Sequence, residues 1–320
     1  MRGGTRGLTV PAAASTLDET ANSKGHVRKG GIMSDGAEAV RSAGVIGLGS
    51  MGMGVALSLL RAGFRVVGCD LDAARCMSLV THGGEAAGSP ADVGRRVDRV
   101  IVLVATAEQV EQVLFGAEGV AGTLPKGGVI VQSTSIPPDM AAAIGRRLAE
   151  RDLAMLDAPV GGGPVRAAEG RMVVMASGPE DAFARAEDLI AAASGTLHRV
   201  GTEHGQGSAV KAVEQMLTGI HAAAVAEATA FGVRAGVDPQ RLSEILAAGP
   251  FHIPSQRPLG IVGTDLGNVM DAARRMTVPT PLAASALQLF TMAAAAGMGR
   301  EGDSALVRVF DRLTGNPQEG

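Results

Sequence analysis

The sequence predicts an α/β fold in which a doubly wound, mainly parallel sheet is followed by an all-α C-terminal domain. From Gly44 to about residue 205, short apolar strands alternate with helical segments, a pattern typical of a parallel sheet covered on both faces. After Gly205-Gln206-Gly207 the strand signals stop and a long alanine-rich helical stretch begins. We therefore expect a sheet domain over residues 43–205 and a helical domain over 206–320.

The glycine pattern after the first expected strand predicts a dinucleotide site. Gly47-x-Gly49-x-x-Gly52 follows the apolar residues 44–46 and opens a helical stretch that continues to residue 63. In such a turn the first glycine permits the tight bend, the second lets a pyrophosphate approach the backbone, and the third lets the helix pack close to the strand. The free N–H groups of the helix then face the phosphates. Strand, turn and helix together indicate a Rossmann-like domain.

Asp70 ends the second expected strand, about twenty residues after the glycine turn. An acid at this point can accept hydrogen bonds from the adenosine ribose hydroxyls, and it would repel the 2′-phosphate of NADP. No arginine directly follows Asp70, although Arg75 lies in the next helix. We therefore expect NAD, with NADP the less favoured cofactor. The alternative is that Asp70 only caps the following helix, over 72–82.

The remaining elements follow from the same alternation of patterns. We expect strands at 44–48, 65–70, 99–105, 128–133 and 153–156, with helices near 51–63, 72–82, 107–115 and 138–151. Two further strands, 172–176 and 196–200, flank a helix over 180–193 and extend the sheet. The C-terminal domain is expected to contain a long helix over 208–236 and shorter helices at 239–248, 265–276, 280–297 and 303–313.

Composition restricts the class of protein. The chain has 320 residues, a hydrophobic content of 46% and a net charge of −3 spread over short mixed runs, and it contains no Trp or Tyr. Nothing here favours nucleic-acid binding. Cys69 and Cys76 lack metal-site spacing and a disulfide framework, which favours a reducing cytoplasm and no bound metal. Polar residues interrupt the apolar run over 213–230, so we expect no membrane span.

Residues 1–42 are expected to form a disordered extension. They are rich in Gly, Ala, Ser and Thr, and they show no apolar periodicity that could support a packed structure. The segment lacks the uninterrupted apolar core of a signal peptide, and Met33 is a plausible later start site.

Three motifs occur in order along the chain: the glycine turn, Asp157-Ala158-Pro159-Val160-Gly161-Gly162-Gly163, and Gly205-x-Gly207-x-x-x-Lys211. With them the chain resembles the β-hydroxyacid dehydrogenase family, which includes 3-hydroxyisobutyrate dehydrogenase and tartronate semialdehyde reductase. The resemblance covers about residues 43–315. The segments 132–138, 174–180 and 281–290 look most like the L-threonate dehydrogenase branch of that family.

The resemblance implies an NAD-dependent oxidoreductase that transfers a hydride between nicotinamide and a small β-hydroxy acid or its oxo form, and that forms a homodimer or a higher homo-oligomer. Lys211 matches the family's catalytic lysine, which takes the hydroxyl proton during oxidation and returns it during reduction. A lysine outside such a motif would be read as a solvated surface charge. The implied cofactor contacts are Gly47, Leu48, Gly49, Ser50, Met51, Gly52, Asp70, Val104, Ala105, Thr106, Ser135 and Thr264. The implied substrate contacts are Gly161, Gly162, Gly163 and Glu214.

Three departures from the family pattern fall on the substrate side of the site. The family's Lys-x-x-Asn is Lys-x-x-Glu here, and a carboxylate at Glu214 shares a helix face with Lys211 and favours its ammonium form. Gly161 replaces a serine, which removes a hydroxyl donor but leaves backbone N–H groups that can bind an anion. Thr264 replaces the family's second lysine, and the segment 250–263 looks shorter than in the family.

These departures leave three functions open. The first is an NAD-dependent dehydrogenase or reductase of a small hydroxy acid. The second keeps the enzyme class but acts on a neutral carbonyl or an imine, which would suit a site that lacks the serine and the second lysine. The third is a dinucleotide-binding protein with weakened catalysis that serves as a sensor or partner subunit. Glu214 could also point into solvent or pair with an arginine, and then it would not affect Lys211.

Overall fold

The computed structural model describes residues 41–249 and 257–314. The expected disordered extension lies outside the described residues, except for Arg41 and Ser42, and Ser42 already opens the first strand. Residues 250–256 of the segment expected to be short also lie outside them. All the described residues belong to one unit of the chain.

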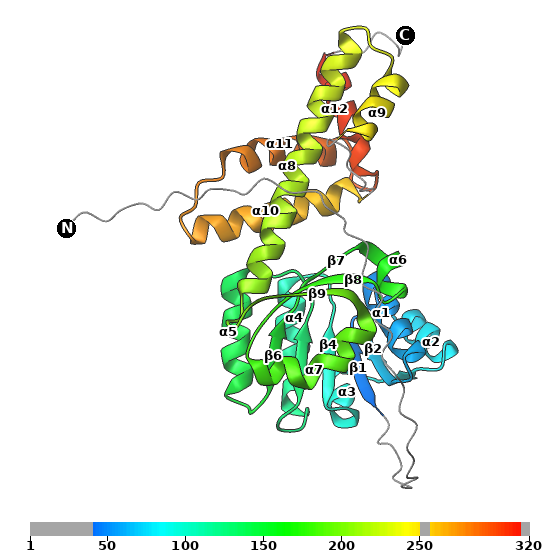
Figure 1. Cartoon of the computed structure of the whole chain (residues 1–320), viewed down its shortest axis with the longest axis vertical. Coiled ribbons are helices and arrows are strands. Elements are labelled where there is room, and N and C mark those ends of the chain that lie inside the picture. Colours follow the sequence, from blue (N-terminus) through cyan, green and yellow to red (C-terminus); the bar gives the residue numbers. More distant parts are fainter. Residues whose placement is uncertain (1–40, 250–256, 315–320) are drawn as a thin grey trace, which may run out of the picture. The chain divides into compact units, whose positions relative to one another are not determined.

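A nine-stranded sheet forms the first part of the described chain (Figure 1). Its strands are β1 (Ser42–Ile46), β2 (Arg65–Cys69), β3 (Glu85–Ala86), β4 (Arg99–Val102), β5 (Val129–Gln132), β6 (Ala154–Asp157), β7 (Val160–Gly161), β8 (Met172–Ser177) and β9 (Ser194–Gly201). The strand order is β3-β2-β1-β4-β5-β6-β8-β7, and β9 pairs with β8. All pairs are parallel except those of β8 with β6 and β7. The predicted doubly wound, mainly parallel sheet is confirmed.

Helices cover both faces of this sheet (Figure 1). They are α1 (Ser50–Arg61), α2 (Ala73–Thr81), α3 (Pro90–Arg96), α4 (Ala107–Phe115), α5 (Pro138–Ala149), α6 (Gly163–Ala168) and α7 (Glu180–Ala193), with a 3₁₀ turn η1 (Val120–Gly122). Successive strand residues alternate between the faces. Val45 packs in the layer with α1, α6 and α7, whereas Ile46 packs in the layer with α3, α4 and α5. Burial on both faces explains the continuous apolar strands.

Five elements of the sheet part are absent from the sequence-based expectation: β3, β7, α3, α6 and the 3₁₀ turn η1. The two strands have two residues each, too few to produce an alternating pattern. The start of α3 carries a capping signal, since Ser89 Oγ accepts a hydrogen bond from Asp92 N at 3.2 Å and Pro90 opens the helix. The strand expected over 99–105 ends at Val102, where its pairing with β1 and β5 stops.

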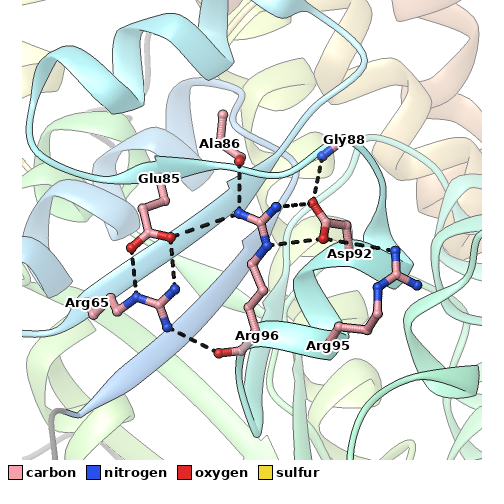
Figure 2. A network of polar contacts seen from close by, with 7 residues as sticks. All are labelled: Arg65, Glu85, Ala86, Gly88, Asp92, Arg95 and Arg96. Carbon is pink, nitrogen blue, oxygen red and sulfur yellow. Dashed lines mark hydrogen bonds and ion pairs between the residues drawn. The ribbon is translucent and has the colours of Figure 1, made fainter.

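An ion-pair network fixes the edge of the sheet at β3 (Figure 2). Arg65 of β2 donates from Nε and Nη2 to the two carboxylate oxygens of Glu85 at 2.7 and 2.8 Å. The hydrogen bond from Arg65 lowers the pKa of Glu85. Arg96 of α3 donates to Asp92 and to the carbonyl oxygen of Ala86. Because these groups are largely exposed, the network contributes modestly to stability. Its role is to hold a short edge strand against β2 and α3.

Helices alone follow β9 among the described residues: α8 (Gln206–Arg234), α9 (Pro239–Ala248), α10 (Leu259–Arg275), α11 (Pro281–Ala295), a 3₁₀ turn η2 (Asp303–Leu306) and α12 (Val307–Thr314). The predicted all-α C-terminal region is confirmed. A third apolar cluster joins α8, α10 and α11, and Gly219 lets α8 approach α10, since a Cβ there would lie 3.0 Å from Leu266 Cδ2. The helix expected to start at residue 265 begins at Leu259. The sequence places its start too late because Gly260 and Gly263 resemble helix breakers.

The helix α8 is unusually apolar for its exposure. It is the one described helix that is long and apolar enough to cross a bilayer, with a mean hydropathy of 1.3 over its most apolar stretch. Core helices of globular proteins have the same properties. Only 22% of that stretch is buried, however, so most of its apolar surface is left uncovered by the described residues.

Candidate active site

The carboxyl ends of the parallel strands meet at one edge of the sheet, and backbone hydrogen bonds continue beyond the strands. Gly47 N donates to Cys69 O and Leu103 N donates to Ile46 O, each at 2.9 Å. The turns after β1, β2 and β4 are thereby held side by side. In open α/β sheets this edge is where ligands bind.

The glycine turn is closed by packing at two of its glycines and open at the third. Gly47 has φ +92°, and a Cβ there would lie 2.2 Å from Leu103 O. A Cβ on Gly52 would lie 1.8 Å from Gly47 O. A Cβ on Gly49 would instead meet nothing nearer than Arg75 Nη1 at 3.9 Å. The helix α1 begins directly after Gly49, so its first N–H groups, including those of Ser50 and Met51, are available to an anion in this space.

Asp70 follows β2 directly, and its side chain is 10% exposed. Its Oδ2 accepts a hydrogen bond from Leu48 N at 2.6 Å and its Oδ1 accepts one from Asp72 N at 2.9 Å. The carboxylate therefore holds the glycine turn, and it keeps lone pairs for a ribose hydroxyl. Asp72, and not Asp70, is the N-cap of α2, because Asp72 Oδ1 accepts from Ala74 N. Arg75 lies 3.5 Å from Asp70 and 3.4 Å from Asp72.

The loop after β4 carries Val104, Ala105 and Thr106, and each is fixed by hydrogen bonds. Val104 N donates to Thr134 Oγ1 at 3.0 Å, which ties this loop to the loop after β5. Ala105 N donates to Gln109 Oε1 at 2.8 Å. Thr106 caps α4 in a reciprocal capping box with Gln109.

The loop after β5 is held by a side chain to which sequence reasoning gave no role. Gln132 is fully buried, donates from Nε2 to Thr134 O, and accepts from Thr134 N at Oε1, both at 2.8 Å. This pair of bonds sets the loop that leads to Ser135. Ser135 in turn lines a small cavity with Lys211 and Asn268. The sequence signal for this loop was a polar Gln-Ser-Thr-Ser run directly after a buried strand.

Lys211 lies in the second turn of α8 and is 8% exposed. Its Nζ forms an ion pair with a carboxylate oxygen of Glu214, whose side chain is 49% exposed. The two residues are spaced i, i+3 on the helix, as the sequence suggested. Gly161 adjoins the pair, because a Cβ there would lie 3.9 Å from both Lys211 Nζ and Glu214 Oε1. The structure therefore differs from the alternatives in which Glu214 only points into solvent or pairs with an arginine, because Glu214 pairs with Lys211.

Asp157 at the end of β6 anchors the start of α8 and so positions Lys211. Its Oδ2 accepts from Gly205 N at 2.9 Å and from Ser208 N at 2.8 Å, and its Oδ1 accepts from Ser208 Oγ at 2.6 Å. Gly207 permits the close approach, since a Cβ there would lie 2.4 Å from Asp157 O. Burial raises the pKa of Asp157, and the hydrogen bonds from Ser208 and Gly205 oppose this effect only in part.

The raised pKa of Asp157 predicts how stability depends on pH. An acid whose pKa is higher in the folded state binds its proton more tightly there, so its contribution is present below the unfolded pKa and is lost as the pH rises through the folded pKa. The variant Asp157→Asn cannot titrate at this position. We expect wild type to lose unfolding free energy relative to Asp157→Asn as the pH rises above the ordinary pKa of an aspartate, about 3.9. Denaturant unfolding across this range measures the difference, and a constant or opposite trend would contradict the assignment.

A cavity of about 600 Å³ opens beside the Lys211–Glu214 pair. Three of the expected substrate residues, Gly161, Gly162 and Glu214, line it together with Arg166 and His198, over apolar side chains of β8 and β9. Gly163 starts α6 next to it. Thr264 does not join either cavity: it is exposed on α10, and its hydroxyl donates to Gly260 O at 2.8 Å. Among the described residues, no group of three His, Cys, Asp or Glu could hold a metal ion.

The sheet order and the open glycine turn define a dinucleotide-binding protein of the doubly wound class, and comparisons with known families agree. The family model described as the NAD binding domain of 6-phosphogluconate dehydrogenase matches residues 42–201. The one described as the NAD-binding region of NADP-dependent 3-hydroxyisobutyrate dehydrogenase matches residues 205–252.

Relatives that match most of the chain identify its family. The L-threonate dehydrogenase of Cupriavidus necator is 48% identical over 285 residues, covering 84% of this chain and 96% of that protein. The Escherichia coli L-threonate dehydrogenase is 42% identical, with 85% and 95% covered. The crystal structure of a 3-hydroxyisobutyrate dehydrogenase from Salmonella typhimurium has a TM-score of 0.76 and 38% identity, and covers 84% of this chain and 99% of that one. The chain belongs to the β-hydroxyacid dehydrogenase family, as its motifs predicted, and it is similar to the L-threonate dehydrogenase branch.

Proposed function

We propose that the protein is an NAD-dependent dehydrogenase or reductase of a small β-hydroxy acid, such as L-threonate or a 3-hydroxyisobutyrate-like acid, or of the matching oxo acid. The observation that carries this proposal is the placement of Lys211. It is a buried lysine with Ser135 across one cavity and with Gly161 next to its Nζ. The relatives named L-threonate dehydrogenase support the substrate class. Turnover linked to NAD(H), measured across a panel of hydroxy acids, aldehydes and imines, tests the proposal.

The residues of the glycine turn suit a dinucleotide. The open space over Gly49 would take the pyrophosphate, the N–H groups at the start of α1 would bind it, and Asp70 would bind the adenosine ribose. We propose NAD as the cofactor, because Asp70 and Asp72 would repel a 2′-phosphate and Arg75 already lies against both carboxylates. When bound, NAD(H) supplies the hydride acceptor or donor. Calorimetric titration with NADH and NADPH tests the choice, and tighter binding of NADPH would overturn it.

The chemistry that the chain itself supplies is proton transfer. As a neutral amine, Lys211 accepts the substrate hydroxyl proton during oxidation, and as an ammonium it donates a proton to the carbonyl oxygen during reduction. Glu214 holds an ion pair with Lys211 Nζ at this position.

The variant Glu214→Asn tests the role of this ion pair. It restores the family's Lys-x-x-Asn pair and removes the carboxylate that contacts Lys211 Nζ. The kcat for reduction should fall, because the amine that donates the proton loses its charged partner, whereas the Kd for NADH should stay at the wild-type value. Steady-state kinetics and calorimetry measure the two quantities. An unchanged kcat would show that Glu214 has no part in proton transfer by Lys211.

We propose three parts for the chain: an extension over 1–42, a dinucleotide-binding domain over 43–205, and a substrate and dimerisation domain over 206–320. The uncovered face of α8 supports a homodimer. Its exposed apolar residues include Val213, Leu217 and Phe231, which are 57%, 62% and 77% exposed. A second copy of the chain would cover this face. Sedimentation at micromolar concentration tests the dimer, and a monomer throughout would contradict it.

We also place the protein in a reducing cytoplasm. Both of its cysteines are free, and Cys69 is buried beneath the site. Burial raises the pKa of Cys69 to about 11, with smaller contributions from Cys76 and nearby carboxylates, so the thiol stays protonated and unreactive at neutral pH.

A second candidate function is the reduction of a neutral carbonyl or an imine. The observation that favours it is the balance of charge at the site: Glu214 offsets the cation of Lys211, and Gly161 brings no hydroxyl to bind a carboxylate. Turnover of neutral carbonyls or imines alone, with no activity on acids, would select this candidate. Cofactor binding without any turnover across the panel would select a catalytically weakened dinucleotide-binding protein.

A further inference from the structure

We propose that Arg166 binds the carboxylate of the substrate in the cavity beside Lys211 and Glu214. The proposal rests on the proposed function and names the group that would hold the acid end of the substrate. Nothing in the family motif points to Arg166, which lies outside the residues that the resemblance assigns to substrate.

The charges around the cavity make Arg166 the cation available to an acid. Lys211 is already paired with Glu214, and Glu214 itself lines the cavity, where it would repel a carboxylate. Arg166 lines the same cavity, and its side chain makes no hydrogen bond or ion pair with any residue in the described ranges 41–249 and 257–314, although its carbonyl oxygen accepts from Arg171 N at 2.8 Å. An arginine guanidinium is a planar, positively charged fork that matches the geometry of a carboxylate. Besides Arg166 and Glu214, the cavity is lined by one further titratable side chain, His198.

The geometry of the loop holds Arg166 over the residues that the family uses for substrate. Gly162 has φ +114°, and a Cβ there would lie 2.9 Å from Arg166 Cδ and 3.2 Å from Arg166 Cβ. The aliphatic part of the Arg166 side chain therefore lies across Gly162. Gly161 lines the same cavity. Such a fold is possible only because residue 162 has no side chain.

Arg166 projects from α6, a helix whose backbone is held in place by packing against α1. The next residue, Ala167, is fully buried against α1, where a Cβ on Gly54 would lie 2.9 Å from Ala167 Cβ. Packing of this kind fixes the backbone from which Arg166 projects. A binding group on a rigid element loses little conformational entropy on binding.

An acid in this cavity needs a cation for a physical reason. A carboxylate that leaves water must recover its hydration energy from charged or hydrogen-bonding partners. This chain lacks two groups of the family pattern that could do so: the serine at position 161 and the lysine at position 264 are Gly161 and Thr264. Thr264 also lies away from the cavity. Arg166 supplies the missing positive charge from α6, the helix that follows Gly161 and Gly162.

The test compares Arg166→Gln with wild type on two substrates, a hydroxy acid and its neutral carboxamide. With the acid, KM should rise roughly 10- to 100-fold, the effect of losing a hydrogen bond to a charged group. With the carboxamide, KM should not change, and kcat and the Kd for NADH should stay near the wild-type values. Arg166→Lys should recover part of the loss, because it keeps the charge and loses the fork.

Arg171→Gln is the matched control. Arg171 is an exposed arginine a short distance along the chain, but it pairs with Glu169 at 2.7 Å and does not line the cavity. It should leave both KM values unchanged. The proposal is overturned if Arg166→Gln leaves the KM of the acid at the wild-type value, or raises the KM of acid and carboxamide equally.

Failure of the proposed function would look different. In that case wild type would turn over no hydroxy acid, and calorimetry with the NADH-bound protein would decide the role of Arg166. Binding of the hydroxy acid that Arg166→Gln weakens would support the arginine as an acid-binding residue. Equal binding to both proteins, or no binding to either, would overturn it.

Discussion

Lys211→Ala is expected to lower kcat by roughly 10²- to 10⁴-fold, the share of catalysis that a positioned acid or base provides. The proton between the substrate oxygen and solvent would lose its carrier, whereas the glycine turn that holds the cofactor lies on other elements. Steady-state kinetics in both directions measure the loss, and a titration with NADH should give an unchanged Kd. Truncation also leaves Glu214 without its partner, so unfolding should be measured in parallel.

Lys126→Ala provides the matched control for this experiment. Lys126 is an exposed lysine paired with Asp152 at 2.6 Å, and it lies in neither of the two cavities at the site. Its removal should leave kcat unchanged. Near-wild-type activity in Lys211→Ala would remove the proposed mechanism altogether.

Gly52→Ala is expected to damage both folding and cofactor binding. The added Cβ would lie 1.8 Å from the carbonyl oxygen of Gly47, a backbone atom of the turn itself, so the turn or the start of α1 must move. Overpacking of this kind costs about 1–3 kcal/mol of unfolding free energy. The Kd for NADH should rise about tenfold or more, since a displaced turn no longer presents its N–H groups correctly. Denaturant unfolding and calorimetry measure the two effects.

Gly49→Ala separates the two effects. A Cβ on Gly49 has no neighbour nearer than 3.9 Å, so the variant should fold with wild-type stability. It should still bind NADH more weakly, because the methyl group occupies the space expected for the pyrophosphate. If Gly52→Ala bound NADH as tightly as wild type, the cofactor would have to lie elsewhere.

The sheet could be predicted from sequence wherever an element carried its own periodicity. Buried strands such as β1 and β5 read as short apolar runs, and α7 matched its predicted range of 180–193. The two missed strands share a cause: β3 and β7 exist through pairing with neighbouring strands and not through a local pattern. The start of α10 was missed because glycines that permit close packing look like helix breakers, as at Gly260 beside Gly299.

The site was predictable where its residues lie close together in sequence. Lys211 and Glu214 are one helical turn apart, so their contact follows from spacing. The support of Lys211 by Asp157 and the link between Val104 and Thr134 join separate strands, and only the fold brings them together. No sequence pattern pointed to Arg166, because the position of its side chain across Gly162 depends on the left-handed backbone conformation of that glycine.

The most direct test of the central claim is hydride transfer itself. Hydroxy acids carrying deuterium on the carbon that bears the hydroxyl are incubated with the enzyme and NAD at alkaline pH, and the reduced cofactor is analysed by mass spectrometry. Our account predicts one deuterium in NADH formed from a small β-hydroxy acid, with formation greatly slowed in Lys211→Ala. Reduced cofactor without deuterium, or no reduced cofactor from any acid of the panel, would contradict it.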